Sequence, residues 1–180
     1  MIDVLIAGAG PVGLALANDL LRWGVSFRIV DQKEGPERNS KAGNLWPRSG
    51  EALAPSGVLQ RLLPQAIRYD TLMVYAYGKR LGSQEIDNFP SPYPESLQIG
   101  QNRIEETMAA HLSERGASVG WQTEVVGVTQ QPKHVTVELK QADGQAEVVE
   151  ARYVVGCDGS RSVVCEAVGL GFERQVMPDR

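Results

Sequence analysis

The residues with the clearest chemical signature form a glycine-rich turn near the N-terminus. The apolar run 4–7 leads into the turn and an amphipathic stretch follows it. In such a turn the first glycine allows a tight bend, the second lets a phosphate approach the backbone, and the third lets helix and strand pack closely. Amides at the start of the following helix attract anions. The spacing therefore predicts a dinucleotide pyrophosphate site. The motif reads Gly8, Ala9, Gly10, Pro11, Val12 and Gly13.

A single carboxylate, Asp31, closes the next apolar run, 27–30, and Gln32 follows it. Asp31 stands about 20 residues after the glycines, which is the spacing at which an acidic residue binds the hydroxyl pair of a ribose. A carboxylate there disfavours a 2′-phosphate, and therefore disfavours NADP at this particular site. We include Gln32 with Asp31 in the candidate nucleotide site.

Length and composition limit the classes of function. The 180 residues suffice for one domain with a sizeable core and are too few for two full ones. A net charge of −4 gives no basic footprint for nucleic acid or an anionic membrane. The charge therefore favours small-molecule ligands. The first apolar run is too short for a signal peptide or membrane span. Cys157 and Cys165 show no metal-ligand spacing, so we expect no metal site, and as reduced interior cysteines they favour a cytoplasmic location.

The first half of the chain predicts a strand, a helix and a second strand, followed by a more irregular region. The helix ends at Gly24 and carries a stripe of apolar residues at helical spacing. We expect a loop at 41–44, helices between 47 and 63 with a break at 55–57, and a proline-rich loop at 89–94. Two strands are expected around a turn at 78–80. The stripe comprises Val12, Leu16, Leu20 and Trp23.

The second half predicts one helix and then mostly strands. Ile104, Met108 and Leu112 form the core stripe of a helix that stops at Gly116, and we assign His111 no role. A short strand at 119–121 precedes an antiparallel meander, whose hairpin turn is Asp143-Gly144. A buried parallel strand, 153–156, then ends in a second glycine turn, and Ser162 caps a short helix whose amides we expect to aim at the ligand. The meander strands are expected at 124–129, 135–139 and 147–152.

Several of these stretches together resemble the flavin-dependent aromatic hydroxylases. These are the single-component monooxygenases related to para-hydroxybenzoate hydroxylase, and the similar branch includes phenol and aromatic polyketide hydroxylases. The resemblance covers nearly the whole chain. It implies an α/β fold: a Rossmann-like FAD-binding fold with a parallel sheet, an antiparallel β-meander crossover and a fragment of the substrate domain at 71–98. The matching residues are 8–14, Ala42-Gly43 to Pro47-Arg48, Gln101 before a helix, and Gly156 to Ser162.

The resemblance also implies which residues bind FAD. The three glycines would cradle the pyrophosphate, Asp31 would hold the adenosine ribose, and Lys41 takes the place of a family arginine near the pyrophosphate. Gln101 would contact the ribityl or phosphate region, and Val125 would lie near the adenine through its backbone. Asp158 and Gly159 would bind FAD and contribute to the NAD(P)H path. For Arg48 and Arg103 a solvated helix charge is favoured over a direct FAD contact.

The implied chemistry is hydroxylation of a small aromatic substrate with dioxygen and NAD(P)H, through a flavin hydroperoxide, and no side chain is identified as catalytic. A related reductase or halogenase and a catalytically silent nucleotide-binding domain remain alternatives. The family usually has an arginine where Cys165 stands and continues well beyond this length, so we expect the isolated chain to be compromised in catalysis. The substrate, the choice between NADH and NADPH, and the oligomeric state stay open.

Overall fold

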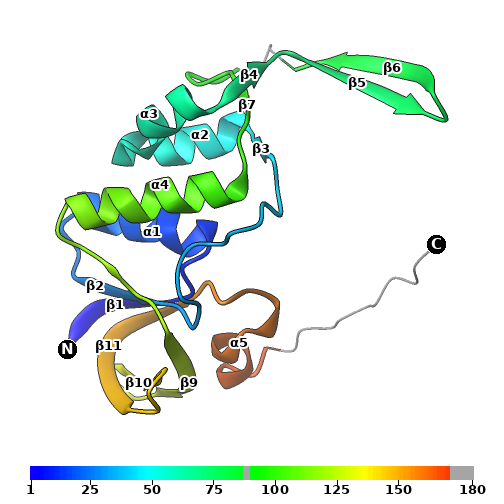
Figure 1. Cartoon of the computed structure of the whole chain (residues 1–180). Helices are drawn as coiled ribbons and strands as arrows, with labels where there is room; N and C mark the ends of the chain where they lie inside the picture. The colour runs from blue at the N-terminus through cyan, green and yellow to red at the C-terminus, as the bar shows by residue number, and fades with distance from the viewer. Residues whose placement is uncertain (87–89, 171–180) are drawn as a thin grey trace. The chain divides into compact units, whose positions relative to one another are not determined.

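The computed structural model describes residues 1–86 and 90–170, which form two compact units (Figure 1). The first unit comprises Met1–Gly13, Gly24–Gly35 and the described chain from Ser118 onward. The second comprises Leu14–Trp23 and Pro36–Ala117, so the boundary falls inside the first helix. Phe89, expected to begin a loop, and the chain end at 178–180 lie outside the described residues.

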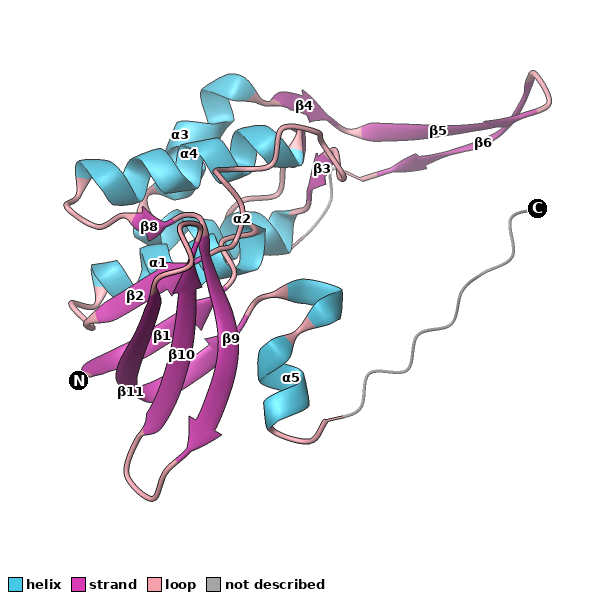
Figure 2. Ribbon diagram, turned by 60° about the horizontal axis from the view of Figure 1, so that its bottom comes forward, coloured by secondary structure: helices cyan, strands magenta, loops and turns pink. Residues whose placement is uncertain are grey.

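The first unit is built on a six-stranded sheet with the order β8-β2-β1-β11-β10-β9 (Figure 2). Strands β8, β2, β1 and β11 run parallel, whereas β11, β10 and β9 form an antiparallel meander. The predicted parallel sheet with a meander is therefore confirmed. The strands are β1 (Ile2–Ala7), β2 (Phe27–Val30), β8 (Val119–Gly120), β9 (Thr123–Gln130), β10 (Val135–Gln141) and β11 (Ala146–Gly156).

Strand β11 joins the two halves of this sheet. The sequence predicts separate strands at 147–152 and 153–156, but the structure has one continuous strand of 11 residues. At Ala151 it pairs antiparallel with Val135 of β10 and parallel with Ile2 of β1. Its far end therefore lies beside the end of β1, with Gly156 opposite Ala7. After it come a short 3-10 helix, η3 (Gly159–Arg161), and α5 (Val163–Ala167), which packs against β9 and β11.

The second unit combines helices with two small sheets. Helices α3 and α4 pack together, and the two-stranded sheet β5-β6 projects from the rest of this unit (Figures 1 and 2). The other sheet has the order β3-β7-β4. Within residues 1–86 and 90–170, no helix is long and apolar enough to cross a membrane. The elements are α1 (Pro11–Arg22, mostly in this unit), β3 (Asn44–Leu45), α2 (Pro47–Leu53), η1 (Ala54–Ser56), α3 (Val58–Leu62), η2 (Leu63–Gln65), β4 (Ile67–Tyr69), β5 (Thr71–Ala76), β6 (Lys79–Glu85), β7 (Ser96–Gln98) and α4 (Gln101–Glu114).

The evenly spaced apolar residues near α1 do not make up its buried face, and Leu16 and Leu20 among them are half-buried. Val12 is 69% exposed and Trp23 is 66% exposed, whereas Leu14, Ala17 and Asn18 are fully buried. The guanidinium of Arg22 lies 4.3 Å from the centre of the Trp23 ring, so this indole packs at the surface. The buried face of α1 thus carries a small and a polar residue that apolar periodicity does not select.

Other differences concern short elements. The hairpin turn between β5 and β6 lies at Tyr77-Gly78, where φ is 49° and 74°, rather than at 78–80. Two residues with positive φ form the turn that best matches the twist of a hairpin. Strands β3, β4 and β7 were not predicted, because two or three residues are too few to show an alternating pattern. The break at Gly57, whose φ is 86°, and the Asp143-Gly144 turn are confirmed.

A buried hydrogen-bonded pair joins α1 to α4 within the second unit. The side-chain nitrogen of Asn18 donates to the carbonyl oxygens of Leu14 (2.8 Å) and Met108 (3.2 Å). Its oxygen therefore accepts from Nδ1 of His111, at 2.7 Å. His111 is only 6% exposed, and burial, followed by the nearby charges of Arg61 and Arg115, lowers its pKa. His111 thus has a structural role: as a neutral imidazole, it donates its Nδ1–H to the side-chain oxygen of Asn18.

We expect the free energy of unfolding to fall as the pH is lowered from about 7 to about 5. The pKa of His111 is lower in the folded chain than in the unfolded chain, so the unfolded chain takes up the proton first and gains stability. His111→Gln keeps a donor for Asn18 and removes the titrating group, so its unfolding free energy changes less over this range. Urea unfolding at each pH measures the difference, with His134→Gln as the control. Equal pH slopes for the native chain and His111→Gln would contradict the assignment.

Candidate functional site

The ends of β1 and β11 meet so closely that only glycine fits between them. Gly8 has a φ of 101°, and a Cβ there would lie 2.8 Å from the backbone nitrogen of Asp158 and collide with the carbonyl of Cys157. A Cβ at Gly13 would collide with the carbonyl oxygen of Gly8. The backbone nitrogen of Cys157 donates to the carbonyl oxygen of Ala7, at 2.7 Å. Two of the three glycines are therefore required by the protein's own packing.

The middle glycine is different. A Cβ added at Gly10 would meet nothing within 4 Å, and its φ is not in the left-handed region. Pro11 and Val12 begin α1 directly after it, and Val12 is largely exposed. The fold itself places no demand for glycine at this position, so the open space beside Gly10 suits a group that approaches the backbone closely.

Asp31 holds the glycine turn in place. One oxygen of its carboxylate accepts the backbone N–H of Ala9 at 2.7 Å, and the other accepts the N–H of Lys33 at 2.9 Å. The residue is 9% exposed, and its backbone bonds to Gly120 and Thr123 of the neighbouring chain segment. Each carboxylate oxygen has a second lone pair, so these bonds leave acceptors for a ribose hydroxyl. The exposed Gln32 follows it at the edge of the turn.

Asp158 lies just after the end of β11 and binds the start of α5. Its Oδ2 accepts the backbone N–H groups of Val163 (2.8 Å) and Val164 (3.4 Å), and Ser162 Oγ accepts that of Cys165 (3.0 Å). The predicted Ser162 cap is confirmed. The expectation that the first amides of α5 point at a ligand is wrong, because these side chains already accept from them. The other oxygen of Asp158, Oδ1, is buried and has no hydrogen-bond partner in the structure.

The neighbouring residues provide little chemistry of their own. Burial raises the pKa of the Cys157 thiol, and the charge of Asp158 raises it further, so this thiol is not activated as a nucleophile. Cys157 and Cys165 are both free. Across the described parts of the chain, no group of three or more potential ligand residues could hold a metal ion. Gly159 has a φ of 76° and open space around it.

Lys41 and Gln101 both lie in the second unit, where a loop meets the start of α4. The Lys41 ammonium lies 2.7 Å from a carboxylate oxygen of Glu37, which raises the pKa of Lys41. The backbone nitrogen of Gln101 donates to the carbonyl oxygen of Ala42 (2.9 Å) and to Ser40 Oγ (3.1 Å). Its side-chain nitrogen donates to Glu105 at 2.8 Å. Glu105 was not among the residues predicted from the sequence, although a carboxylate beside the apolar stripe of a helix is a visible signal.

The remaining candidates are less prominent. Val125 lies in β9, and its side chain belongs to the hydrophobic core of the sheet with Leu5 and Leu139. Its backbone stands at an irregular point of the strand, because the register between β9 and β10 shifts there. Arg48 pairs with Glu51 and Arg103 with Glu106, each within one helix and at exposed positions. These pairs fit the favoured interpretation of both arginines as solvated helix charges.

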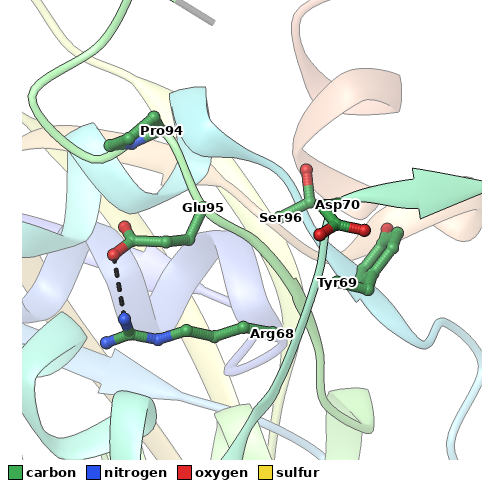
Figure 3. A pocket seen from close by; sticks show the side chains of 6 residues that line it. All are labelled: Arg68, Tyr69, Asp70, Pro94, Glu95 and Ser96. Carbon is green, nitrogen blue, oxygen red and sulfur yellow. Dashed lines mark ion pairs between the residues drawn. The ribbon is translucent and has the colours of Figure 1, made fainter. Parts of the chain in front are cut away.

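The second unit also has an open hollow between β4 and β7 (Figure 3). Arg68 and Glu95 form an ion pair of 3.2 Å on one side of it. The hydroxyl oxygens of Tyr69 and Ser96 are buried without a hydrogen-bond partner in the structure. These two residues lie opposite each other in the paired strands. The hollow can therefore take a small hydrogen-bonding molecule such as water. It is lined by Arg68, Tyr69, Asp70, Pro94, Glu95 and Ser96.

The geometry of the glycine turn agrees with the comparison with known protein families. The model of one family, described as an FAD binding domain, matches residues 1–178. The chain belongs to this family. Membership of this family indicates FAD as the nucleotide.

Relatives of this FAD binding domain include longer enzymes. The chain is 37% identical to 6-methylpretetramide 4-monooxygenase of Streptomyces rimosus over 93% of its own length and 30% of the relative's. It is 36% identical to rifampicin monooxygenase of Streptomyces venezuelae, covering 96% of the chain and 35% of that protein. A crystal structure of aklavinone-11 hydroxylase with FAD and aklavinone is 27% identical, with a TM-score of 0.81 over 93% of this chain and 35% of that one. The chain thus spans about a third of these relatives.

The residues of the first unit fit an FAD pyrophosphate. The space beside Gly10 is open, and the amides at the start of the 12-residue α1 follow directly. The buried Oδ1 of Asp158 lacks a donor, and a hydroxyl or amide of a bound ligand can supply one. A buried polar atom without a partner is costly, so its presence at the end of β11 favours a ligand there.

The glycines differ in a way that stability measurements can detect. We expect Gly13→Ala to lower the free energy of unfolding by about 2 kcal/mol or more, because its Cβ collides with backbone that cannot move aside cheaply. Gly10→Ala should lower it by less than about 1 kcal/mol, the scale of a change next to a helix start. Urea unfolding of both variants provides the comparison. Equal free energies of unfolding for Gly10→Ala and Gly13→Ala would contradict this expectation, because they would show that the turn relaxes around a side chain at position 13.

Proposed function

We propose that this chain binds FAD with the pyrophosphate beside Gly10 and the adenosine ribose at Asp31. The observation that carries the proposal is the difference among the glycines, since the packing of the fold requires Gly8 and Gly13 but leaves Gly10 open. Gly8, Pro11, Val12 and Gly13 contribute the turn and the amides of α1. Asp31 accepts from the ribose through the lone pairs that Ala9 and Lys33 leave unused.

The other predicted contacts complete the proposal. Gln32 borders the adenosine side, and Val125 lies near the adenine through its backbone. Asp158 accepts a hydrogen bond from the cofactor through Oδ1, and Gly159 allows close approach after it. Lys41 supplies positive charge near the pyrophosphate, and Gln101 contacts the ribityl region.

We further propose that the whole protein is an FAD-dependent monooxygenase acting on a small aromatic substrate with dioxygen and NAD(P)H. The support comes from the relatives, which include monooxygenases and hydroxylases. When bound, reduced FAD activates dioxygen for transfer of one oxygen atom to the ring. The residues of this chain bind and orient the cofactor, and no side chain among them is assigned a catalytic step. The cytoplasmic location and the oxygenation route implied by the resemblance stay predictions.

The segment 71–98 is proposed to contribute to the substrate side, with 1–180 as the FAD-binding part. Its described portion includes the β5-β6 hairpin, which exposes several large apolar side chains. An exposed apolar surface of this kind favours contact with a substrate or with further protein. The exposed side chains are Leu72, Met73, Val74, Tyr75, Tyr77 and Leu81.

The FAD site can be tested at its most specific residue. We expect Gly10→Val to weaken FAD binding at least about tenfold, because the added side chain occupies the space that the pyrophosphate needs. Its thermal midpoint should stay close to that of the native chain, since nothing in the protein lies within 4 Å of the new Cβ. Quenching of flavin fluorescence during titration measures the affinity. Gly82→Val, at an open position in β6, is the control, and unchanged affinity in Gly10→Val would contradict the proposed site.

The activity requires a separate test on the full-length protein. With FAD bound, we expect oxidation of NADH or NADPH and consumption of dioxygen to accelerate when a phenolic substrate is added. A panel of phenols and aromatic polyketides, monitored by absorbance at the nicotinamide band and by an oxygen electrode, identifies the substrate class. FAD binding without stimulated oxidation across the panel would leave a nucleotide-binding domain that lacks hydroxylase activity.

A further inference from the structure

Glu105 is a charged side chain in an unusual place. It lies on the buried side of α4 and is only 1% exposed, which is rare for a carboxylate without specific partners. One oxygen, Oε2, accepts the backbone N–H of Glu37 at 2.9 Å. The other, Oε1, accepts from Nε2 of Gln101, one turn earlier in the same helix, at 2.8 Å. Burial of a carboxylate is costly, and these two donors offset part of that cost.

These bonds connect α4 to the loop that carries Lys41. Besides the Glu37–Glu105 bond, Ser40 Oγ accepts the backbone N–H of Gln101 and donates to the carbonyl oxygen of Ala42. Farther along, the backbone nitrogen of Ile99 donates to the carbonyl oxygen of Gly43, at 2.9 Å. The loop and the start of α4 are therefore held together at several points, and the Glu105 carboxylate bonds to both.

The bond to Glu105 also decides which way the amide of Gln101 faces. A carboxylate offers only acceptors, so the Gln101 nitrogen must face Glu105 and the amide oxygen must face away. The outward-facing oxygen can accept a hydrogen bond from a hydroxyl group. It is a poor partner for phosphate oxygens, which are themselves acceptors. The family resemblance implies a contact of Gln101 with either the ribityl chain or the phosphate, and this orientation favours the hydroxyls of the ribityl chain.

We propose that Glu105 is a positioning residue for FAD, which fixes the amide of Gln101 so that its oxygen accepts from a ribityl hydroxyl. The inference rests on the proposed function, because it requires that the chain binds FAD through Gln101. Glu105 itself makes no contact with the cofactor. Its effect reaches the cofactor through the orientation of Gln101, while the bond to Glu37 holds the loop.

Glu105→Gln separates this role from simple packing. The new amide has the same size, and its oxygen can still accept from the N–H of Glu37. Its nitrogen, however, is a donor facing Gln101, so the Gln101 amide turns its oxygen inward and its nitrogen outward. A ribityl hydroxyl can accept from that nitrogen, but its own hydrogen then lacks the acceptor that the Gln101 oxygen supplied, so we expect FAD affinity to fall about tenfold. ADP lacks the ribityl chain, and its affinity should change by less than about twofold.

The matched control is Glu106→Gln, the same change at the next position of α4. Glu106 is exposed and pairs with Arg103 at 3.1 Å, so its FAD affinity should equal that of the native protein. The reciprocal exchange, Gln101→Glu with Glu105→Gln, rebuilds the bond with donor and acceptor reversed and again leaves an acceptor facing outward. We expect it to recover FAD affinity to within about threefold of the native value.

Titrations with FAD and ADP, together with thermal midpoints, decide between the outcomes. Native FAD affinity in Glu105→Gln, an equal loss of FAD and ADP affinity, or no recovery in the exchange variant would each overturn the positioning role. Should Glu105→Gln fail to fold, the single variant Gln101→Glu replaces it: it sets two carboxylates against each other, so FAD affinity should fall and then recover in the exchange variant. A native protein that binds neither FAD nor ADP would instead overturn the proposed function.

Discussion

The first unit depends on the contact between the ends of β1 and β11, where the backbones approach too closely for any Cβ. Gly8 lies against the Cys157–Asp158 peptide, and Gly13 lies against Gly8. This contact aligns the two parallel strand ends and fixes where α1 begins. Asp31 secures the same turn from the β2 side by accepting the N–H of Ala9. The ends of three adjacent strands, β2, β1 and β11, are therefore joined before any ligand is present, which lowers the ordering cost of binding.

The second unit uses buried polar groups in a comparable way. Asn18 and His111 join two helices through a donor–acceptor pair, and Glu105 joins a helix to a loop. Apolar contacts such as those of Leu112 and Met108 give these helices most of their burial, but such contacts have little directionality. Hydrogen bonds from buried groups specify rotation and register, and the penalty for breaking them is high. The polar interior of this unit therefore determines how Gln101 is presented.

The sequence predicts well those parts of the fold whose conformation depends on residues close by in the chain. The strand, glycine turn, helix and second strand are of this kind, as are the Asp143-Gly144 turn and the Ser162 cap. The buried face of α1 could not be predicted from apolar spacing, because Ala17 and Asn18 are buried while Val12 is exposed. Strands of two or three residues, such as β3 and β7, exist only through pairing with distant segments.

The same distinction applies to the candidate site. Asp31, Asp158 and Gln101 were selected from motif positions, but their hydrogen bonds could not be. Asp31 accepts from a residue 22 positions away, and Glu105 accepts from one 68 positions away. Such partners become visible only when the chain is folded. They add a structural role to Asp31 and Asp158, and a positioning role to Glu105, beyond what spacing indicates.

The open space beside Gly10 is the proposed FAD site. The most direct measurement is the visible absorbance spectrum of the purified protein before and after FAD is added, with the released nucleotide identified by chromatography. The structure predicts flavin bands that remain after removal of free FAD, and a released compound that is FAD and not FMN. A protein that stays colourless after incubation with FAD would contradict the claim.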